Sequence, residues 1–505
     1  MTTVAEKHPR GLYVLFGTEM WERYSFYTVQ AMLSLYLRDT VHGFSFSNAQ
    51  SASVVSTYNM FIYFTPLLGG LIADRLTGFR KAIMIGGVSF MIGHALLAVP
   101  NSLFICYLAL TFLVIGNGFF KPNVSSLVGN LYPEGSHLKD KAYVIFYMGI
   151  NIGALMAPLV ANFIRPRWGF HPAFFMGAIG MVLALLVFGF NQKWVRHADR
   201  RTVVDHKALA VTEDLPPVSE AAATMEAVPE WKRIMALIVI FIIVIVFWMV
   251  FHQNSISLIW WADDHSRRLP GILSFAINPL YIIILSLPLA AFWSWLDKRD
   301  LEPSTPVKMM IGMLLTGLSF VILYFSATSG GFTKPAFEVV KSTASEMLVS
   351  ISPEARKHLG ITAQPIRIDE KTEVWRVTNT GTPVVEGDFV RLESHSGDTI
   401  TVAPTSRVSA LWLIIAYGVL SLGELMLSPM GLSLVSKVAP IRMRGLMMGG
   451  WFAATAIGNK LTGVAGYWDR WSHANFFIIL ASMALTMAVV LLLLLRPLKK
   501  AMPGV

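Results

Sequence analysis

The feature that most constrains this chain is a series of long apolar runs, each about 20 residues in length. An α-helix of that length spans the roughly 30 Å of hydrocarbon in a membrane. The composition agrees, because 54% of the 505 residues are hydrophobic and 14% are charged, against roughly 25% charged in ordinary soluble domains. These values exclude a water-soluble enzyme, a disulfide-rich secreted scaffold and a disordered chain. The sequence predicts an all-α polytopic membrane protein.

Hydropathy and turn residues divide the chain into twelve predicted transmembrane helices in two bundles of six. These helices are expected at residues 11–37, 48–74, 80–99, 102–130, 140–164, 172–191, 231–260, 271–296, 306–328, 408–437, 442–467 and 473–496. The N-terminal bundle is predicted to occupy residues 1–191, and the polar, proline-containing stretch 192–230 to be a cytoplasmic linker. The C-terminal bundle is predicted in two parts, helices 7–9 in 231–329 and helices 10–12 with a cytoplasmic tail in 408–505.

Residues 330–407 interrupt the helical pattern between the ninth and tenth predicted helices. Apolar and polar residues alternate around 366–368, 374–377, 389–392 and 399–402, with turn dipeptides such as Ser396-Gly397 between runs. Alternation of this kind is typical of half-buried β-strands. The segment is therefore predicted to form a small β-rich domain on the outer side of the membrane. Two roles for this domain remain open: it is a passive insertion, or it provides a surface that contacts substrate or another protein.

Basic residues gather at one set of helix ends, as at Arg80, Lys81, Arg442 and Lys499. Because cytoplasmic loops are enriched in Lys and Arg, we expect both termini to be cytoplasmic. The net charge of +10 is accounted for by these loops and does not indicate nucleic-acid binding. The expected location is a bacterial inner membrane, as an integral multi-pass protein. No removable signal peptide is recognised, and one cysteine, Cys106, carries no information about redox compartment.

A loop between the second and third predicted helices carries a specific spacing of glycines and charges. Residues 70–81 read Gly-Leu-Ile-Ala-Asp-Arg-Leu-Thr-Gly-Phe-Arg-Lys, and a shorter counterpart, Asp297-Lys298-Arg299, follows the eighth helix. Matching features in two six-helix halves indicate an internal repeat of the kind found in secondary transporters. The first copy resembles the loop motif of the major facilitator superfamily, which implies that superfamily's fold.

Ionisable residues inside the predicted helices are the strongest functional signal, since each costs roughly 2.5–3.5 kcal/mol at a helix centre unless it is paired or faces water. The set is Glu19, Glu22, Arg23, Lys121, Glu424 and Lys460. In the first helix, the spacing of Glu19, Glu22, Arg23, Phe26, Tyr27 and Gln30 places all six on one face. That face is predicted to line a polar cavity in which acids carry protons and cations bind an anion. A fixed ion-pair cluster between helices is the structural alternative.

These residues resemble the signature of the proton-dependent oligopeptide transporter (POT) family. The first-helix motif is Glu19-Met20-Trp21-Glu22-Arg23-Tyr24-Ser25-Phe26-Tyr27. Further matching motifs are Phe120-Lys121-Pro122-Asn123, the run from Phe146 to Gly153, Asn278-Pro279, the run from Gly423 to Pro429, and Trp451-Phe452. The resemblance covers nearly all predicted helices and excludes residues 192–230 and 330–406.

The resemblance implies a role for each matching residue. Those implied in proton coupling are Glu19, Glu22, Arg23, Lys121 and Glu424, with Glu22 paired to Lys121. Those implied in substrate binding are Arg23, Tyr27, Tyr63, Lys121, Tyr147, Asn151, Trp248, Asn278, Glu424 and Trp451. Arg23 and Lys121 would receive a peptide's carboxylate and Glu424 its amino group. Packing remains an alternative for Tyr63, Trp248 and Trp451, and hydrogen bonding between helices for Asn151 and Asn278.

Three positions depart from the family pattern. Phe26 replaces a frequent Tyr, Gln30 a frequent Arg, and His252 a frequent acid, so the ion pair that joins the latter two positions in other members is absent. We hypothesise a neutral hydrogen bond between Gln30 and His252. Because histidine titrates near neutral pH, His252 is also a candidate outer proton site, with a merely hydrogen-bonded histidine as the alternative.

The predicted function is a proton-coupled symporter that imports di- and tripeptides by alternating access, acting as a monomer. No enzyme activity is expected. Protons are the expected coupling ion, and no cofactor or metal is predicted. The alternatives are the same fold carrying another anion or zwitterion, such as nitrate, a drug-like molecule or a modified amino acid, or a non-transporting receptor.

Overall fold

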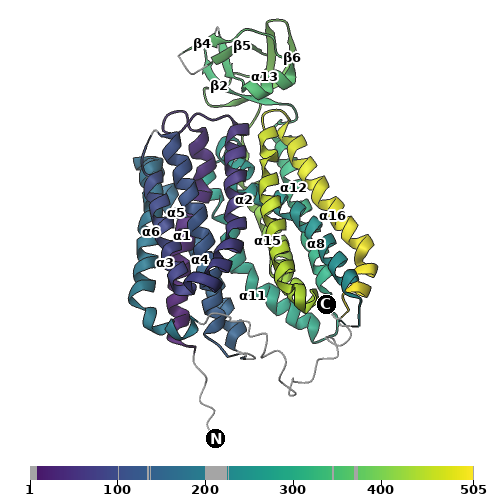
Figure 1. The fold of residues 1–505 in the computed structure, drawn as a ribbon. Helices are drawn as coiled ribbons and strands as arrows, with labels where there is room; N and C mark the ends of the chain where they lie inside the picture. Colours follow the sequence, from purple (N-terminus) through teal and green to yellow (C-terminus); the bar gives the residue numbers. More distant parts are fainter. Residues whose placement is uncertain are drawn as a thin grey trace.

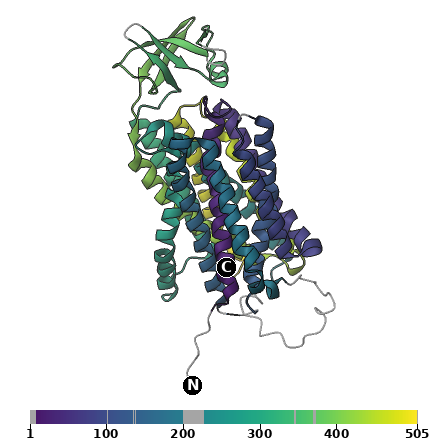
Figure 2. The same cartoon turned by 90° about the vertical axis from the view of Figure 1, so that its left-hand side faces the viewer.

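The computed structural model describes residues 8–100, 102–133, 136, 138–199, 225, 227–343, 346–368 and 373–503. Most of the predicted linker, residues 200–224, lies outside the described residues. Two bundles of long helices stand side by side, and a small β-sheet domain sits over one end of the C-terminal bundle (Figure 1). The described part of the chain begins at the opposite end of the molecule from the sheet (Figure 2).

The N-terminal bundle consists of six long helices that follow the predicted segments closely. They are α1 (Arg10–Arg38), α2 (Asn48–Ile72), α3 (Phe79–Leu97), α4 (Leu103–Asn130), α5 (Leu138–Trp168) and α6 (Phe170–Phe190). Glycines permit close contacts between helices. Membrane helices depend on such packing because the hydrophobic effect does not drive their association within lipid. At the crossing of α2 and α4, a Cβ on Gly69 would lie 1.9 Å from the carbonyl oxygen of Gly118.

The C-terminal bundle is less regular. Its long helices are α8 (Glu230–Phe251), α11 (Ile277–Asp297), α12 (Thr305–Ser329), α14 (Ala410–Val438), α15 (Arg444–Leu461) and α16 (His473–Ala501). The predicted helix 231–260 is broken after α8 into a 3₁₀ turn, η5 (His252–Ser255), a short helix α9 (Ser257–Trp260) and a π turn, η6 (Trp261–His265). A short helix, α10 (Gly271–Ser274), precedes α11, and α15 continues as a 3₁₀ segment, η8 (Thr462–Tyr467).

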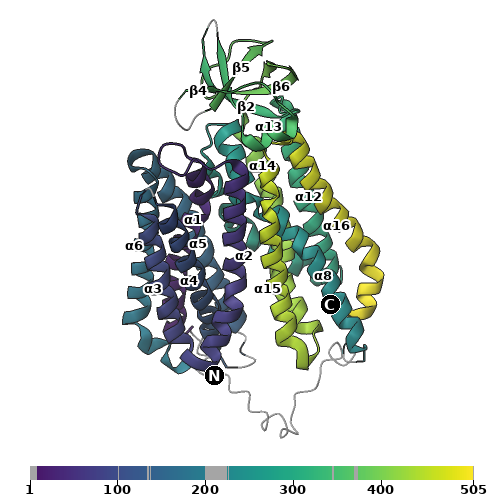
Figure 3. The same cartoon turned by 45° about the horizontal axis from the view of Figure 1, so that its top comes forward.

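Within the described ranges, nine helical stretches are long and apolar enough to cross a membrane. They run in chain order from α3 to α16 and include the stretch Glu230–His265, but α1, α2 and α15 are not among them. The chain is therefore an integral, multi-pass membrane protein. At the boundary between bundles, α2 runs beside α15 (Figures 1 and 3), and η8 approaches α2 so closely that a Cβ on Gly463 would lie 3.1 Å from the Ser56 hydroxyl.

The segment between α12 and α14 folds into a compact, barrel-like sheet of six strands. These are β2 (Ala336–Ser342), β3 (Met347–Ser350), β4 (Ile366–Arg367), β5 (Glu373–Asn379), β6 (Phe389–Ser396) and β7 (Thr399–Pro404). Their order is β3-β2-β6-β7-β5-β4, with an extra β3–β5 pairing that joins strands across the sheet. The four runs recognised in the sequence coincide with β4 to β7, whereas β2, β3 and the short helix α13 (Pro353–Leu359) were not predicted.

Close packing at the crossing of α2 and α4 can be tested with Gly69→Ala. The added methyl group would meet the backbone of α4, so we expect a loss of roughly 1–3 kcal/mol in stability, measured as a lower melting temperature in detergent. Gly189→Ala is the matched control, because a Cβ there meets nothing within 4 Å. Equal melting temperatures for the two variants would contradict this packing.

Candidate binding cavity between the bundles

A cavity of about 340 Å³ lies between the two bundles. Its walls come from α1, α2, α4 and α5 on one side and from α8, η5, α11, α14 and α15 on the other. Every residue predicted to bind substrate lines it, and these are Arg23, Tyr27, Tyr63, Lys121, Tyr147, Asn151, Trp248, Asn278, Glu424 and Trp451. His252 also lines the cavity, whereas Glu19 and Glu22 do not. Helices far apart in sequence thus bring the predicted residues together.

Arg23 is the central charged group on the α1 side. Its Nε donates to Glu22 Oε2 at 2.5 Å, and its Nη2 donates to Glu22 Oε1 at 2.6 Å. Its Nε also lies 3.3 Å from Glu19 Oε1, one turn earlier on α1. All three side chains are at most 2% exposed. Two carboxylates therefore share one guanidinium in a buried site, where charged pairs interact strongly.

Asn117 on α4 completes the partners of Arg23. Its side-chain oxygen accepts a hydrogen bond from Arg23 Nη2 at 3.2 Å, while its Nδ2 donates to the Ile62 carbonyl at 2.6 Å. Sequence reasoning missed this residue. The available signal was its position four residues before Lys121, on the same face of α4.

Lys121 does not form the pair with Glu22 that the family resemblance implies. Its ammonium lies 4.9 Å from the centre of the Tyr63 ring, a cation–π contact, and Glu22 is engaged by Arg23. No carboxylate of the described residues comes within 4.0 Å of the Lys121 ammonium. Lys121 thus presents a positive charge to the cavity with no anionic partner in contact.

The opposite wall carries the acid of α14. Asn278 Nδ2 on α11 donates to Glu424 Oε2 at 2.9 Å and lies 2.9 Å from the hydroxyl of Ser421. This hydrogen bond orients one oxygen of the carboxylate. A cavity with Arg23 and Lys121 on one wall and Glu424 on the other therefore has opposite charges on opposite bundles.

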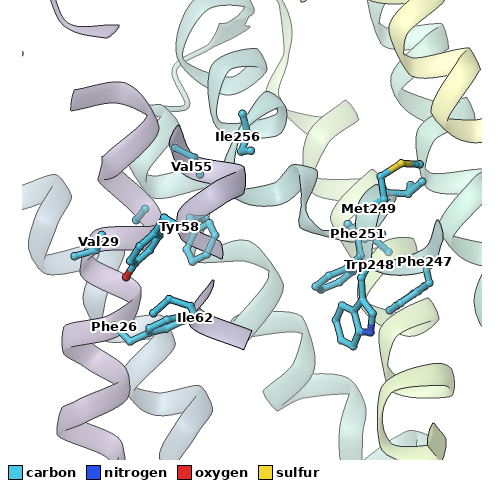
Figure 4. Close-up of a cluster of buried hydrophobic side chains, with 14 of the residues drawn as sticks. Phe26, Val29, Val55, Tyr58, Ile62, Phe247, Trp248, Met249, Phe251 and Ile256 are labelled. Carbon is cyan, nitrogen blue, oxygen red and sulfur yellow. The ribbon is translucent and has the colours of Figure 1, made fainter. Parts of the chain in front are cut away.

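Aromatic rings form the apolar part of the cavity. Phe26 of α1 lies on one side, with Trp248 and Phe251 of α8 on the other (Figure 4). The imidazole of His252 stacks on Trp248, with ring centres 4.9 Å apart and an angle of 16°, and lies 5.5 Å from Tyr63. Such walls contact varied side chains without requiring particular hydrogen bonds.

The predicted hydrogen bond between Gln30 and His252 is wrong. Gln30 Nε2 donates instead to Asn59 Oδ1 on α2 at 2.7 Å, and the His252 ring is held in its stack with Trp248. Asn59 Nδ2 in turn donates to the Ser255 hydroxyl at 3.4 Å. A series of hydrogen bonds between uncharged side chains therefore runs from α1 through α2 to η5 and joins the two bundles. Asn59 and Ser255 line the cavity and were missed because nothing in their spacing marks them.

Lys460, unexplained in sequence, makes a separate contact between the bundles. Its ammonium donates to the Thr57 hydroxyl on α2 at 2.5 Å, from an exposed position near the end of α15. This residue lies outside the cavity lining.

These observations define a membrane protein with two helical bundles around a central charged cavity, the architecture of a secondary transporter. A family model described as the POT family matches residues 80–213, 203–358 and 390–468. The chain belongs to the POT family of peptide transporters, which is a family of transporters and not of enzymes.

Relatives and a solved structure match over nearly the whole chain. An uncharacterised transporter of Bacillus subtilis, YclF, is 29% identical over 99% of this chain and 96% of its own length. A di-/tripeptide transporter of Lactococcus lactis subsp. cremoris is 27% identical over 98% and 97%. The crystal structure of a peptide transporter POT in complex with sulfate has a TM-score of 0.75 and 25% identity, over 98% of this chain and 96% of that one.

The buried charge cluster can be tested by removing its cation. Arg23→Met leaves Glu22 and Glu19 without their guanidinium, so we expect a destabilisation of about 3–5 kcal/mol, measured by thermal unfolding in detergent. Adding Glu22→Gln to Arg23→Met should recover part of that loss, because one uncompensated acid is gone. A double variant less stable than Arg23→Met would contradict this account.

Proposed function

We propose that this chain is a proton-coupled symporter that imports di- and tripeptides by alternating access. The observation that carries the proposal is the cavity between the bundles, with the cations Arg23 and Lys121 on one wall and the acid Glu424 on the other. A free peptide is a zwitterion, so its carboxylate fits the first wall and its amino group the second. The cavity volume of about 340 Å³ lies within the range of small-molecule sites. The Lactococcus lactis relative carries the name di-/tripeptide transporter.

Coupling follows from competition for Arg23. In the observed arrangement Glu22 takes two of the guanidinium's N–H groups, and Glu19 lies against the same Nε. A proton on either acid weakens its hold on Arg23 and frees N–H groups for a peptide carboxylate. Loss of the substrate lets the guanidinium return to the acids and favours release of the proton. Proton binding and substrate binding therefore support one another, as linkage requires.

The membrane arrangement is part of the same proposal. We propose that α1, α2 and α15 cross the membrane beside the nine apolar stretches, giving twelve spans in two bundles with the predicted limits 1–191, 231–329 and 408–505. Both termini then lie in the cytoplasm of a bacterium, and the sheet domain within 330–407 lies outside. Lys and Arg at the helix ends support this orientation. The protein acts as a monomer, because its cavity is formed by one chain.

The function is tested by uptake of a labelled dipeptide into proteoliposomes under an inward proton gradient. We expect accumulation by the wild type, and loss of accumulation in Glu19→Gln and Glu22→Gln, with peptide counterflow retained. Glu386→Gln in the sheet domain is the control, since its side chain is exposed and is not part of the cavity lining. Accumulation that survives both changes would remove the coupling assignment. Uptake of nitrate or a modified amino acid in place of peptides would favour the alternative substrates.

The proton role of His252 is a separate prediction. His252 lines the cavity, and its Nδ1 is buried without a hydrogen-bond partner in the described residues. If His252 carries a proton, His252→Gln should shift the pH profile of dipeptide uptake, while Ser428→Ala, another lining residue, leaves its shape unchanged. An unshifted profile for His252→Gln would show that the imidazole serves only in packing against Trp248.

A further inference from the structure

The sheet domain is attached to the C-terminal bundle by backbone pairing and apolar contacts. The short strand β1 (Ser266–Arg267), which follows η6, pairs in parallel with β8 (Val408–Ser409), which precedes α14. The ring of His265 lies 4.5 Å from that of Phe389 in β6, and the Phe332 carbonyl accepts from the amide of Ala474 at the start of α16 at 3.2 Å. Contacts of this kind are not easily broken and re-formed during a transport cycle. The domain is therefore a rigid extension of the C-terminal bundle.

Among the residues that the structure describes, the same domain reaches the N-terminal bundle through a polar contact at the start of α2. The hydroxyl of Ser47, the N-cap of α2, donates to Glu354 Oε1 of α13 at 3.0 Å. Both side chains are only partly buried. A hydrogen bond between two partly buried side chains can open at lower cost than the backbone pairing and ring contacts that hold the domain to the other bundle.

Two further contacts between the bundles lie beside this one. Asn48 Nδ2 donates to Asp469 Oδ1 at 2.6 Å, and Asp469 also accepts a hydrogen bond from Ser352, the N-cap of α13. At the end of α1, Arg38 Nη2 lies 2.8 Å from Asp264 Oδ2 in η6. Residues of α13 thus contact both sides of the boundary where the first two helices meet the C-terminal bundle.

Glu338 of strand β2 lies near enough to the Arg38–Asp264 pair to be influenced by both charges. Partial desolvation and the nearby Asp264 carboxylate raise the pKa of Glu338, an exposed residue of β2, while Arg38 and Arg407 act in the opposite direction. Glu338 is therefore in the electrostatic field of that pair. Two separate elements of the domain, α13 and β2, approach the end of the boundary that must separate for an outward opening.

We propose that the sheet domain is a clamp on the outer gate: it moves with the C-terminal bundle and, through Glu354 and Ser47, holds the end of α2 so that the outer ends of the bundles stay together. The proposal rests on the alternating-access function proposed above. It assigns the domain a role within the chain, in place of a passive insertion. Opening the gate then requires the breaking of the Ser47–Glu354, Asn48–Asp469 and Arg38–Asp264 contacts together.

The clamp is tested by distances between spin labels at the outer ends of the bundles. Labels are placed on cysteines at Phe104 of α4 and Leu411 of α14, which are 76% and 63% exposed, in a Cys106→Ser background of the full chain in lipid nanodiscs. Glu354→Ala removes the acceptor, and we expect the long-distance population to rise by roughly threefold or more. Glu386→Ala, an exposed acid of the same domain, should leave the distribution unchanged.

A charge exchange separates the clamp from a general loss of structure. Ser47→Asp keeps a good N-cap for α2 but places a carboxylate against Glu354, so it should open the outer end further than Glu354→Ala. Combining Ser47→Asp with Glu354→Lys replaces repulsion with attraction and should return the distribution to that of the wild type.

The clamp is overturned if Glu354→Ala matches Glu386→Ala, or if Glu354→Lys fails to reverse the effect of Ser47→Asp. The distances are measured without substrate, so an incorrect peptide assignment leaves them unaffected. Conversely, failure of the clamp with intact dipeptide uptake would leave the proposed function standing.

Discussion

A buried guanidinium shared by two carboxylates is the interaction on which the rest of this structure depends. The Arg23 side chain is 2% exposed and contacts Glu22 and Glu19. It lies within α1, where the surrounding helices exclude water from it. A charge in that position is tolerated only with close partners. The partners fix the geometry of α1 against α4, where Asn117 also binds Arg23, and so keep one wall of the cavity polar between apolar helices. The remaining site residues are arranged around this wall.

Most of the helical fold was predictable, because a helix that crosses a membrane needs a long run of apolar residues. Such runs are easily recognised in the sequence. The predicted segment 11–37 became Arg10–Arg38, and 473–496 became His473–Ala501. The break of 231–260 after Phe251 was not predictable, since the residues that follow, His252 to Ser255, depart from helical geometry through tertiary contacts of the cavity and not through proline or glycine. Strand β3 was missed because it is a run of buried residues, Met347 to Val349, with no alternation to recognise. Strand β2 does alternate around Phe337 to Val339 and was overlooked.

The site was predictable wherever residues are costly in a membrane or belong to a motif. Arg23, Lys121, Glu424 and the aromatic residues all reach the cavity, because helical periodicity fixes which side of a helix they occupy. Individual hydrogen bonds were not predictable. The Gln30 side chain had several candidate hydrogen-bond partners. Only the position of α2 determines that Asn59 accepts its hydrogen bond. The pairing of Glu22 with Arg23, its neighbour in sequence, likewise depends on side-chain rotamers that spacing does not determine.

The formal charges around the cavity have a consequence for energetics. When all five groups are ionised, the three carboxylates Glu19, Glu22 and Glu424 outnumber the two cations Arg23 and Lys121, so the set carries one negative charge in excess. One added proton makes the net charge of the set zero. A bound zwitterionic peptide does not change this net charge, because its own net charge is zero. In the proposed cycle the loaded protein thus rearranges around an uncharged site. The cycle as a whole carries one positive charge inward, so an inside-negative membrane potential supplies about 2.3 kcal/mol per 100 mV in addition to the pH gradient.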